Sequence, residues 1–185
     1  VLGRYFSPDI KNEIEETGLN FSEYIPKNLN VAVLFTDIVG FTKLSEKMEP
    51  NDVLELLSEY QTIMVECIFE FNGTVDKFIG DAVMANFGTP KSYGNDAQNA
   101  FDCAKKMKSM LHEWNKNRID NRQKVIEHRI GIHYGECIVG NVGGEKRVEY
   151  TVLGDTVNVA SRLCDLSKIF NNDLLISKAL YDQIE

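Results

Sequence analysis

The sequence predicts an α+β sandwich, a mixed sheet with helices packed on it, and three features of its apolar pattern indicate this class. A continuously apolar, β-branched run covers 31–35, which is typical of a strand buried on both faces. Two longer segments, 51–71 and 95–114, repeat their apolar residues with the period of an amphipathic helix. Short alternating runs separate these segments, so strands and helices alternate only in part along the chain.

The first half of the chain is expected to fold as a strand, a helix and a hairpin. The strand covers 31–35, and the helix over 51–71 ends at Gly73, because glycine commonly terminates helices. Residues 74–87 then form two short strands around Gly80-Asp81, a pair that favours the positive φ angles of a tight turn. The hairpin therefore carries a carboxylate at its tip.

The second half begins with the helix over 95–114 and continues mainly as strands. Alternating apolar residues predict a strand over 125–134, a turn at Gly135 and a further strand over 136–141. The remaining predicted elements are a strand over 149–153, a helix over 155–167 and a last strand over 174–177.

Composition and charge exclude several classes of protein. The 185 residues include 28 acidic and 20 basic side chains, a formal net charge of -8, and this balance disfavours nucleic acid as a partner. No apolar run reaches the roughly 20 residues of a membrane-spanning helix, so no membrane segment is expected within the chain. The four cysteines are widely separated and form no C-x-x-C pair, which favours reduced, buried thiols and a cytoplasmic compartment.

The chain is expected to contain one folded domain and a connector. Residues 1–30 are polar and include Pro8, Gly18 and Pro26, a composition typical of a linking segment. The apolar core starts at residue 31, so the domain is expected over 31–185. The sequence opens without a targeting signal, as an excised fragment would, and we expect an upstream regulatory region, with or without a membrane anchor, before Val1.

Two aspartates far apart in the sequence are candidate metal ligands. Asp37 ends the first apolar strand ahead of a glycine turn, and Asp81 occupies the hairpin tip. If the hairpin pairs beside the first strand, the two carboxylates converge and either share a proton or bind a metal. Oxygen ligands beside a phosphate favour Mg²⁺ or Mn²⁺. The alternative is that Asp37 caps a helix and Asp81 only fills a turn.

The predicted helix over 155–167 carries a second polar cluster. Asn158 and Arg162 are four residues apart and so share one helical face, where an amide beside a cation suits a phosphoryl transition state. The alternative is an ordinary surface pair. On the hairpin, Lys77 lies two residues from both Val75 and Ile79 and so is expected on the same strand face as they are. Its amine would emerge from this otherwise apolar face, where it reaches water or donates to a ligand.

Three motifs join these candidates: Phe-Thr-Asp-Ile-x-Gly-Phe-Thr from Phe35, Lys-Phe-x-Gly-Asp from Lys77, and Tyr-Thr-x-x-Gly-Asp-x-Val-Asn-x-Ala-x-Arg-Leu from Tyr150. In this order they resemble the class III nucleotidyl cyclases, the family of adenylyl and guanylyl cyclase catalytic domains. The resemblance runs from about Val31 to Ser177. It implies a ferredoxin-like or palm-type mixed sheet, and a catalytic domain over 31–185 that is truncated at its C-terminal end.

The resemblance implies a metal and phosphate site. Asp37 and Asp81 would hold two divalent ions, Mg²⁺ or Mn²⁺, with the Ile38 carbonyl as a further ligand. The backbone of four consecutive residues would cradle the triphosphate: Val39, Gly40, Phe41 and Thr42. Either Lys146 or Arg147 would meet the terminal phosphates, and Arg147 is preferred.

The resemblance also implies ATP as the substrate. Lys77 would donate to a ring nitrogen and Thr151 would accept from the exocyclic amine, which selects adenine, whereas guanylyl members carry Glu and Cys at these positions. Asn158 would hold the ribose, and Arg162 would stabilise charge on the α-phosphate during in-line attack by the 3′-hydroxyl. The products would be 3′,5′-cyclic AMP and pyrophosphate. In this family two half-sets of residues, the metal acids and the Lys, Thr, Asn and Arg set, serve one nucleotide from opposite protomers, which implies a homodimer with two identical sites.

Two other functions stay open. A guanylyl cyclase would share the metal acids and the overall fold. A catalytically silent, dimerising nucleotide-binding module of a signalling protein would have lost a metal acid or the Asn158 and Arg162 pair, and none is lost here. A diguanylate-forming relative also uses two carboxylates on an α+β palm, but the sequence contains no Gly-Gly-Asp-Glu-Phe run.

Overall fold

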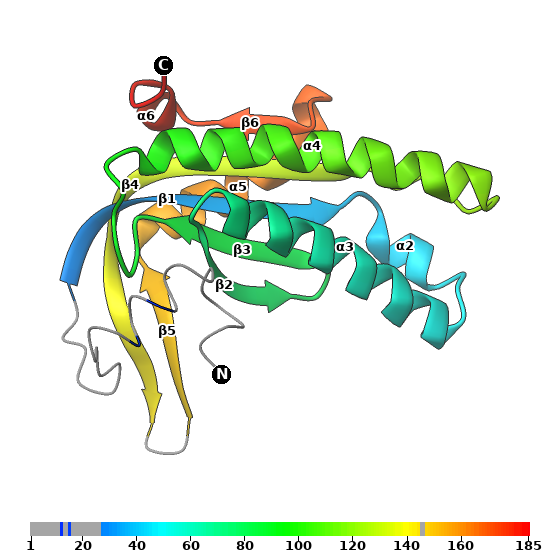
Figure 1. Ribbon diagram of the computed structural model, residues 1–185, viewed down its shortest axis with the longest axis horizontal. Helices are drawn as coiled ribbons and strands as arrows, with labels where there is room; N and C mark the ends of the chain where they lie inside the picture. The colour runs from blue at the N-terminus through cyan, green and yellow to red at the C-terminus, as the bar shows by residue number, and fades with distance from the viewer. Residues whose placement is uncertain (1–11, 13–14, 16–26, 145–146) are drawn as a thin grey trace.

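The computed structural model describes residues 27–144 and 147–185, together with the isolated positions 12 and 15. Within these ranges the chain forms a six-stranded sheet with helices on both faces (Figure 1), which confirms the α+β class. Most of the expected connector over 1–30 lies outside the described residues. Its last four residues belong to the first strand of the sheet.

Six strands build the sheet, and they are β1 (Lys27–Ile38), β2 (Thr74–Ile79), β3 (Ala82–Phe87), β4 (His128–Gly144), β5 (Arg147–Leu153) and β6 (Leu174–Ile176). Their order is β2-β3-β1-β4-β5, and each of these neighbours is antiparallel. β4 pairs with β1 along one edge, while its other edge pairs first with β6, in parallel, and then with β5. The β4–β5 hairpin extends away from the rest of the molecule (Figure 1).

The helices divide between the two faces of the sheet, and they are α2 (Phe41–Ser45), α3 (Pro50–Glu70), α4 (Asp96–Asp120), α5 (Asp155–Phe170) and α6 (Lys178–Tyr181). Figure 1 shows α3 and α4 on one side of the sheet and α5 on the other. The strand predicted over 31–35 explains this arrangement, because successive side chains of β1 point to opposite faces. Ala32 and Leu34 pack with α3 and α4, while Val31 and Val33 pack with α5.

The turn predicted at Gly135 is wrong, because β4 continues through this residue as a single strand. A Cβ at Gly135 would lie 2.7 Å from Thr156 Oγ1, at the start of α5. Thr156 Oγ1 in turn donates to the Glu136 carbonyl oxygen at 2.7 Å. The absence of a side chain at Gly135 therefore lets α5 approach the sheet closely, and close approach of another element is a common reason for glycine within a strand.

The expected face of Lys77 is also wrong, because β2 contains a β-bulge between Val75 and Lys77. Val75 lies opposite Ala85, whereas Lys77 lies opposite Met84. Ala85 and Met84 are consecutive residues of β3 and belong to the apolar clusters on opposite faces of the sheet. The bulge thus directs Lys77 to the face covered by α5 and not to the face of Val75.

All four cysteines are free and buried, as the sequence predicts. Burial raises the pKa of the Cys67 thiol to about 11 and that of Cys164 to about 12. Every helix in the described part of the chain is too short or too polar to cross a membrane.

A buried polar chain crosses the core between β1, α3 and β4. Thr36 Oγ1 lies 2.8 Å from the Tyr60 hydroxyl oxygen, which lies 3.5 Å from His128 Nδ1. His128 Nε2 is buried and has no hydrogen-bond partner among the described residues. Burial lowers the pKa of His128 to about 4, so the neutral imidazole is strongly favoured in the folded protein.

We expect Gly131→Ala to destabilise the protein strongly. A Cβ at Gly131 would lie 2.2 Å from the Cys164 backbone nitrogen and 2.6 Å from the Ala160 carbonyl oxygen, so the whole of α5 would have to move. The free energy of unfolding should fall by about 3 kcal/mol or more in a urea titration. Gly73→Ala is the matched control, because its Cβ would meet only side-chain atoms of Ile68 and Phe87. A larger loss in the control would contradict the rigid contact.

His128 should make the protein less stable at acidic pH. The unfolded chain takes up a proton on this residue below its ordinary pKa of 6.5, whereas the folded protein does so only near pH 4. The free energy of unfolding should therefore fall as the pH drops from 6.5 to 4, by about 3 kcal/mol from this group. Urea titrations across this range should show a smaller fall in His128→Gln. His112→Gln, which replaces an exposed imidazole, should behave as the wild type.

Candidate nucleotide and metal site

Asp37 and Asp81 meet where β1 ends. β1 and β3 pair with Thr36 opposite Val83, and this register brings the β2–β3 turn beside the end of β1. The Ile38 amide donates to Asp81 Oδ2 at 2.9 Å. Asp37 does not cap a helix, because α2 begins at Phe41, its N-cap residue is Gly40, and no side chain caps it with a hydrogen bond. The two acids predicted from the sequence therefore converge, and the capping alternative for Asp37 is wrong.

Arg129, a residue that sequence reasoning missed, pairs with Asp37. The two residues lie opposite each other on β4 and β1, with 3.2 Å between Arg129 Nε and Asp37 Oδ1. The two groups are not aligned as a hydrogen bond, and Asp37 Oδ1 and Arg129 Nη1 are buried without a hydrogen-bond partner in the described residues. Burial raises the pKa of Asp37 to about 6, Arg129 opposes this rise and Asp81 adds to it.

These groups fit a divalent cation. A desolvated carboxylate with an oxygen that accepts no hydrogen bond is stabilised by a nearby positive ion, and Asp81 supplies a second carboxylate beside it. The described residues contain no group of three or more His, Cys, Asp or Glu side chains that could hold a metal ion. Such a site would therefore take its remaining ligands from backbone, water and phosphate oxygens, which is the usual preference of Mg²⁺.

The Gly40 turn leads from this acid pair into α2. Gly40 has φ of 67°, a left-handed conformation that costs glycine little. The Val39 amide already donates to the Glu127 carbonyl oxygen at 2.8 Å. In the described part of the chain no acceptor is found for the amides of Gly40, Phe41 and Thr42, so these three remain for a phosphate.

Lys77 and Thr151 come together at one buried carboxylate, that of Asp76. Thr151 Oγ1 donates to Asp76, with 2.7 Å to Oδ1 and 2.9 Å to Oδ2. Lys77 Nζ lies 3.6 Å from Asp76 Oδ1, and the Val152 amide donates to Oδ2 at 3.1 Å. Burial raises the pKa of Asp76, while Thr151, Val152 and Lys77 act in the opposite direction. Sequence reasoning missed Asp76, whose only signal was a charge next to Lys77 in a strand.

Asn158 and Arg162 lie apart from both groups. Both are exposed on α5, which buries Thr156, Ala160, Cys164 and Ser167 against the sheet. No hydrogen bond or ion pair of either residue is found within the described residues. Lys146 lies outside the described residues, and the Arg147 side chain is likewise not described, although its backbone pairs with Gly144.

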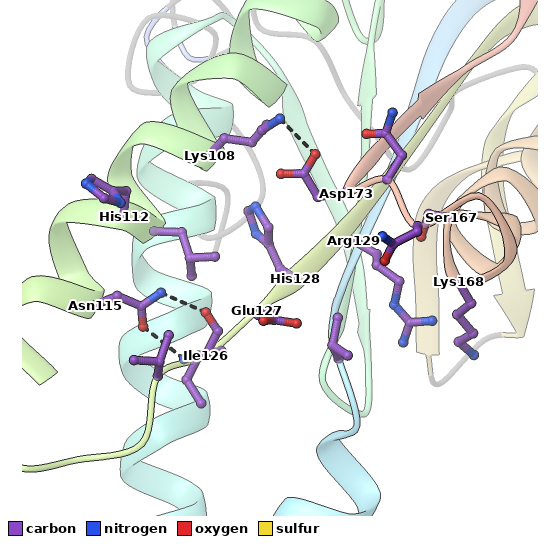
Figure 2. A pocket seen from close by; sticks show the side chains of 15 residues that line it. Lys108, His112, Asn115, Ile126, Glu127, His128, Arg129, Ser167, Lys168 and Asp173 are labelled. Carbon is purple, nitrogen blue, oxygen red and sulfur yellow. Dashed lines mark hydrogen bonds and ion pairs between the residues drawn. The ribbon is translucent and has the colours of Figure 1, made fainter. Parts of the chain in front are cut away.

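A groove of about 690 Å³ opens between α4, the start of β4 and the end of α5, and its lining includes Val39 and Arg129 from the acid site. Figure 2 shows His128 directed toward α4 and Arg129 directed toward α5 from adjacent positions of β4. Lys108 and Asp173 are paired at its rim, with 2.8 Å between Nζ and Oδ1. Lys77 and Thr151 are not among its lining residues, so this groove is separate from the groups predicted to read the base.

Comparisons with known proteins show the family of this chain. The sequence model of the "Adenylate and Guanylate cyclase catalytic domain" matches residues 23–182. Adenylate cyclase 1 of Rhizobium meliloti (strain 1021) is 33% identical over 190 residues, covering 93% of this chain and 29% of that protein. The adenylate cyclase of Anabaena cylindrica is 38% identical over 154 residues, covering 81% and 30%. The chain thus spans about 30% of the length of these curated relatives.

Solved cyclase structures share the fold. The adenylyl cyclase CyaB from P. aeruginosa is 36% identical with a TM-score of 0.78, over 86% of this chain and 82% of that one. The guanylyl cyclase Cya2 is 32% identical with a TM-score of 0.79, over 86% and 80%. A bacterial light-regulated adenylyl cyclase is 28% identical with a TM-score of 0.86, over 97% and 52%. The chain therefore belongs to the adenylate and guanylate cyclase catalytic domain family and is a nucleotidyl cyclase domain.

Proposed function

We propose that this domain is an adenylyl cyclase that converts ATP into 3′,5′-cyclic AMP and pyrophosphate. The observation that carries the proposal is the convergence of Asp37 and Asp81 beside the Gly40 turn, where one carboxylate is desolvated and keeps an oxygen that accepts no hydrogen bond. Two carboxylates next to open backbone amides suit a metal-bound triphosphate. The curated relatives from Rhizobium meliloti and Anabaena cylindrica carry the name adenylate cyclase, which supports the same reaction.

Asp37, Asp81 and the Ile38 carbonyl would hold Mg²⁺ or Mn²⁺. Bound there, the ions would offset charge on the attacking and leaving oxygens. Arg129 adds a buried guanidinium next to Asp37, and the Nη1 atom of this arginine is available as a donor to a phosphate oxygen. The amides of Gly40, Phe41 and Thr42 would hold the triphosphate, so the chain contributes mainly positioning and electrostatic stabilisation.

Lys77 and Thr151 would select the base. The lysine donates to a ring nitrogen of adenine and the threonine hydroxyl accepts from the exocyclic amine. The contact of both side chains with Asp76 supports this assignment, because it gathers the two residues at one place.

Guanylyl cyclase activity is the second candidate function, since the guanylyl cyclase Cya2 shares the fold. GTP turnover above ATP turnover would favour that candidate.

The two half-sets would act across a homodimer. In a single chain Asn158 and Arg162 are exposed and make no contact with the acid pair among the described residues. Exposed apolar side chains on β2 and on the β4–β5 hairpin offer a surface for a second copy, and they include Phe78, Ile79, Ile138, Val142 and Leu153. Asn158 of one protomer would hold the ribose, and Arg162 would stabilise charge on the α-phosphate during attack by the 3′-hydroxyl.

Turnover of ATP tests the reaction directly. With ATP and Mn²⁺, the wild type should form cyclic AMP and pyrophosphate in equal amounts, faster than it forms cyclic GMP from GTP. Arg162→Ala should lower kcat by about 10² to 10³, the cost of removing one preorganised donor. Lys168→Ala, which removes another exposed cation from α5, is the matched control and should keep full activity. Absence of cyclic AMP at high protein concentration would contradict the proposal.

Mixing inactive variants tests the shared site. Asp37→Ala and Asn158→Ala damage different half-sets, so each heterodimer should contain one intact site and one doubly damaged site. An equimolar mixture at exchange equilibrium should recover about a quarter of wild-type activity. Asp37→Ala mixed with Asp81→Ala is the control, because both changes affect the same half-set and no intact site can form. Recovery in the control, or none in the first mixture with heterodimers present, would contradict cross-protomer sites.

A further inference from the structure

Asp76 joins the two side chains that are proposed to read the purine. Its carboxylate accepts from Thr151 Oγ1 at 2.7 and 2.9 Å and lies 3.6 Å from Lys77 Nζ. Asp76 is 5% exposed and Thr151 4% exposed, so little water competes for the bond between them. The β-bulge between Val75 and Lys77 is the local irregularity that lets adjacent side chains of β2 meet in this way.

The chemistry of this contact fixes the direction of the Thr151 hydroxyl. An ionised carboxylate only accepts hydrogen bonds, and a threonine hydroxyl carries a single proton. That proton is given to Asp76, so Thr151 Oγ1 can offer a ligand only its lone pairs. The Val152 amide, which donates to Asp76 Oδ2 at 3.1 Å, and the positive charge of Lys77 both favour the ionised, accepting form of Asp76.

We propose that Asp76 is the positioning residue that makes the domain select adenine over guanine, by holding Thr151 Oγ1 as an acceptor. Adenine carries an amine donor where guanine carries a carbonyl acceptor. An acceptor at Thr151 pairs with the amine but faces the guanine carbonyl with its own lone pairs. A hydroxyl that is free to rotate serves either base. The inference rests on the proposed function, because it takes Thr151 to face the purine.

A purely structural role for Asp76 would give the same distances. β2 and β5 occupy opposite ends of the strand order, so the Asp76 contacts with Thr151 and Val152 also tie the two ends of the sheet together. The two roles differ in what a substitution changes. A structural tie affects stability alone, whereas a positioning residue changes the choice of base, and does so only while the Thr151 hydroxyl is present.

The sharpest variant is Asp76→Asn, which keeps the shape of the side chain but replaces one acceptor by an NH₂ donor. The Val152 amide needs the oxygen at the Oδ2 position, so the NH₂ group takes the Oδ1 position, 2.7 Å from Thr151 Oγ1, and donates to it. The Thr151 hydroxyl loses its nearer acceptor and keeps only the Oδ2 oxygen at 2.9 Å, which it shares with the Val152 amide, so its proton is held less firmly and can also be given to the ligand. The ratio of kcat/KM for ATP to that for GTP should fall about tenfold or more, as for one misplaced buried hydrogen bond. In a Thr151→Val background the same substitution should leave the ratio unchanged.

Thr74→Val is the matched control on the same strand. Thr74 is 2% exposed and donates to the Thr89 carbonyl oxygen at 2.6 Å, so its loss removes a buried hydrogen bond away from the Asp76 contacts. This variant should be less stable in urea yet keep the wild-type ATP to GTP ratio. An unchanged ratio in Asp76→Asn, or an equal fall in the Thr151→Val background, would overturn the inference.

Binding separates this inference from the proposed function. Dissociation constants for 3′-deoxy-ATP and 3′-deoxy-GTP, which lack the attacking hydroxyl, give the same selectivity ratio without turnover. A wild type that forms no cyclic nucleotide contradicts the proposed function, and the binding ratios of the same variants then decide the role of Asp76. Selective binding of the adenine analogue that is lost in Asp76→Asn supports the inference. Equal binding of both analogues by the wild type overturns it.

Discussion

The register of β1 between β3 and β4 is the constraint on which the candidate site depends. Pairing with β3 brings the Asp81 carboxylate to the Ile38 amide, and pairing with β4 sets Arg129 directly opposite Asp37. Side chains of a strand alternate between its faces, so a slip of one residue would turn Asp37 toward α3 and α4 and separate it from both partners. The apolar residues 31–34, buried on both faces, fix this register. The chemistry at the end of β1 is therefore set by packing in its middle.

The order of the elements and the meeting of the two acids could be predicted from the sequence, because periodicity and turn residues determine both. The errors fell where tertiary contacts decide. A glycine within an alternating run predicts a turn, but Gly135 instead admits α5, and no local signal distinguishes the two cases. The bulge in β2 shifted the face of Lys77 for a similar reason. Arg129 and Asp76 were missed because an isolated charged side chain in a predicted strand is normally assigned to the solvent-exposed face of the sheet.

The buried charges of this site are only partly compensated. Asp37 has an ion-pair partner without an aligned hydrogen bond, and burial keeps its pKa high. Asp76 is better satisfied, since Thr151 and Val152 both donate to it. Such incompletely paired groups lower the stability of the free protein and are common where a charged ligand completes the pairing. The two apolar clusters on either side of the sheet provide the stability that tolerates this cost.

The burial of all four cysteines makes their thiols unreactive toward thiol reagents in the folded protein. The thiolate is the reactive form, and burial raises the pKa of Cys67, Cys103, Cys137 and Cys164 alike. Maleimides and mild oxidants should thus leave the native fold untouched. A single cysteine engineered at an exposed helical position would then carry a spin label or fluorophore without removal of any natural thiol. Distances between two such probes would follow the assembly of two copies on an unaltered core.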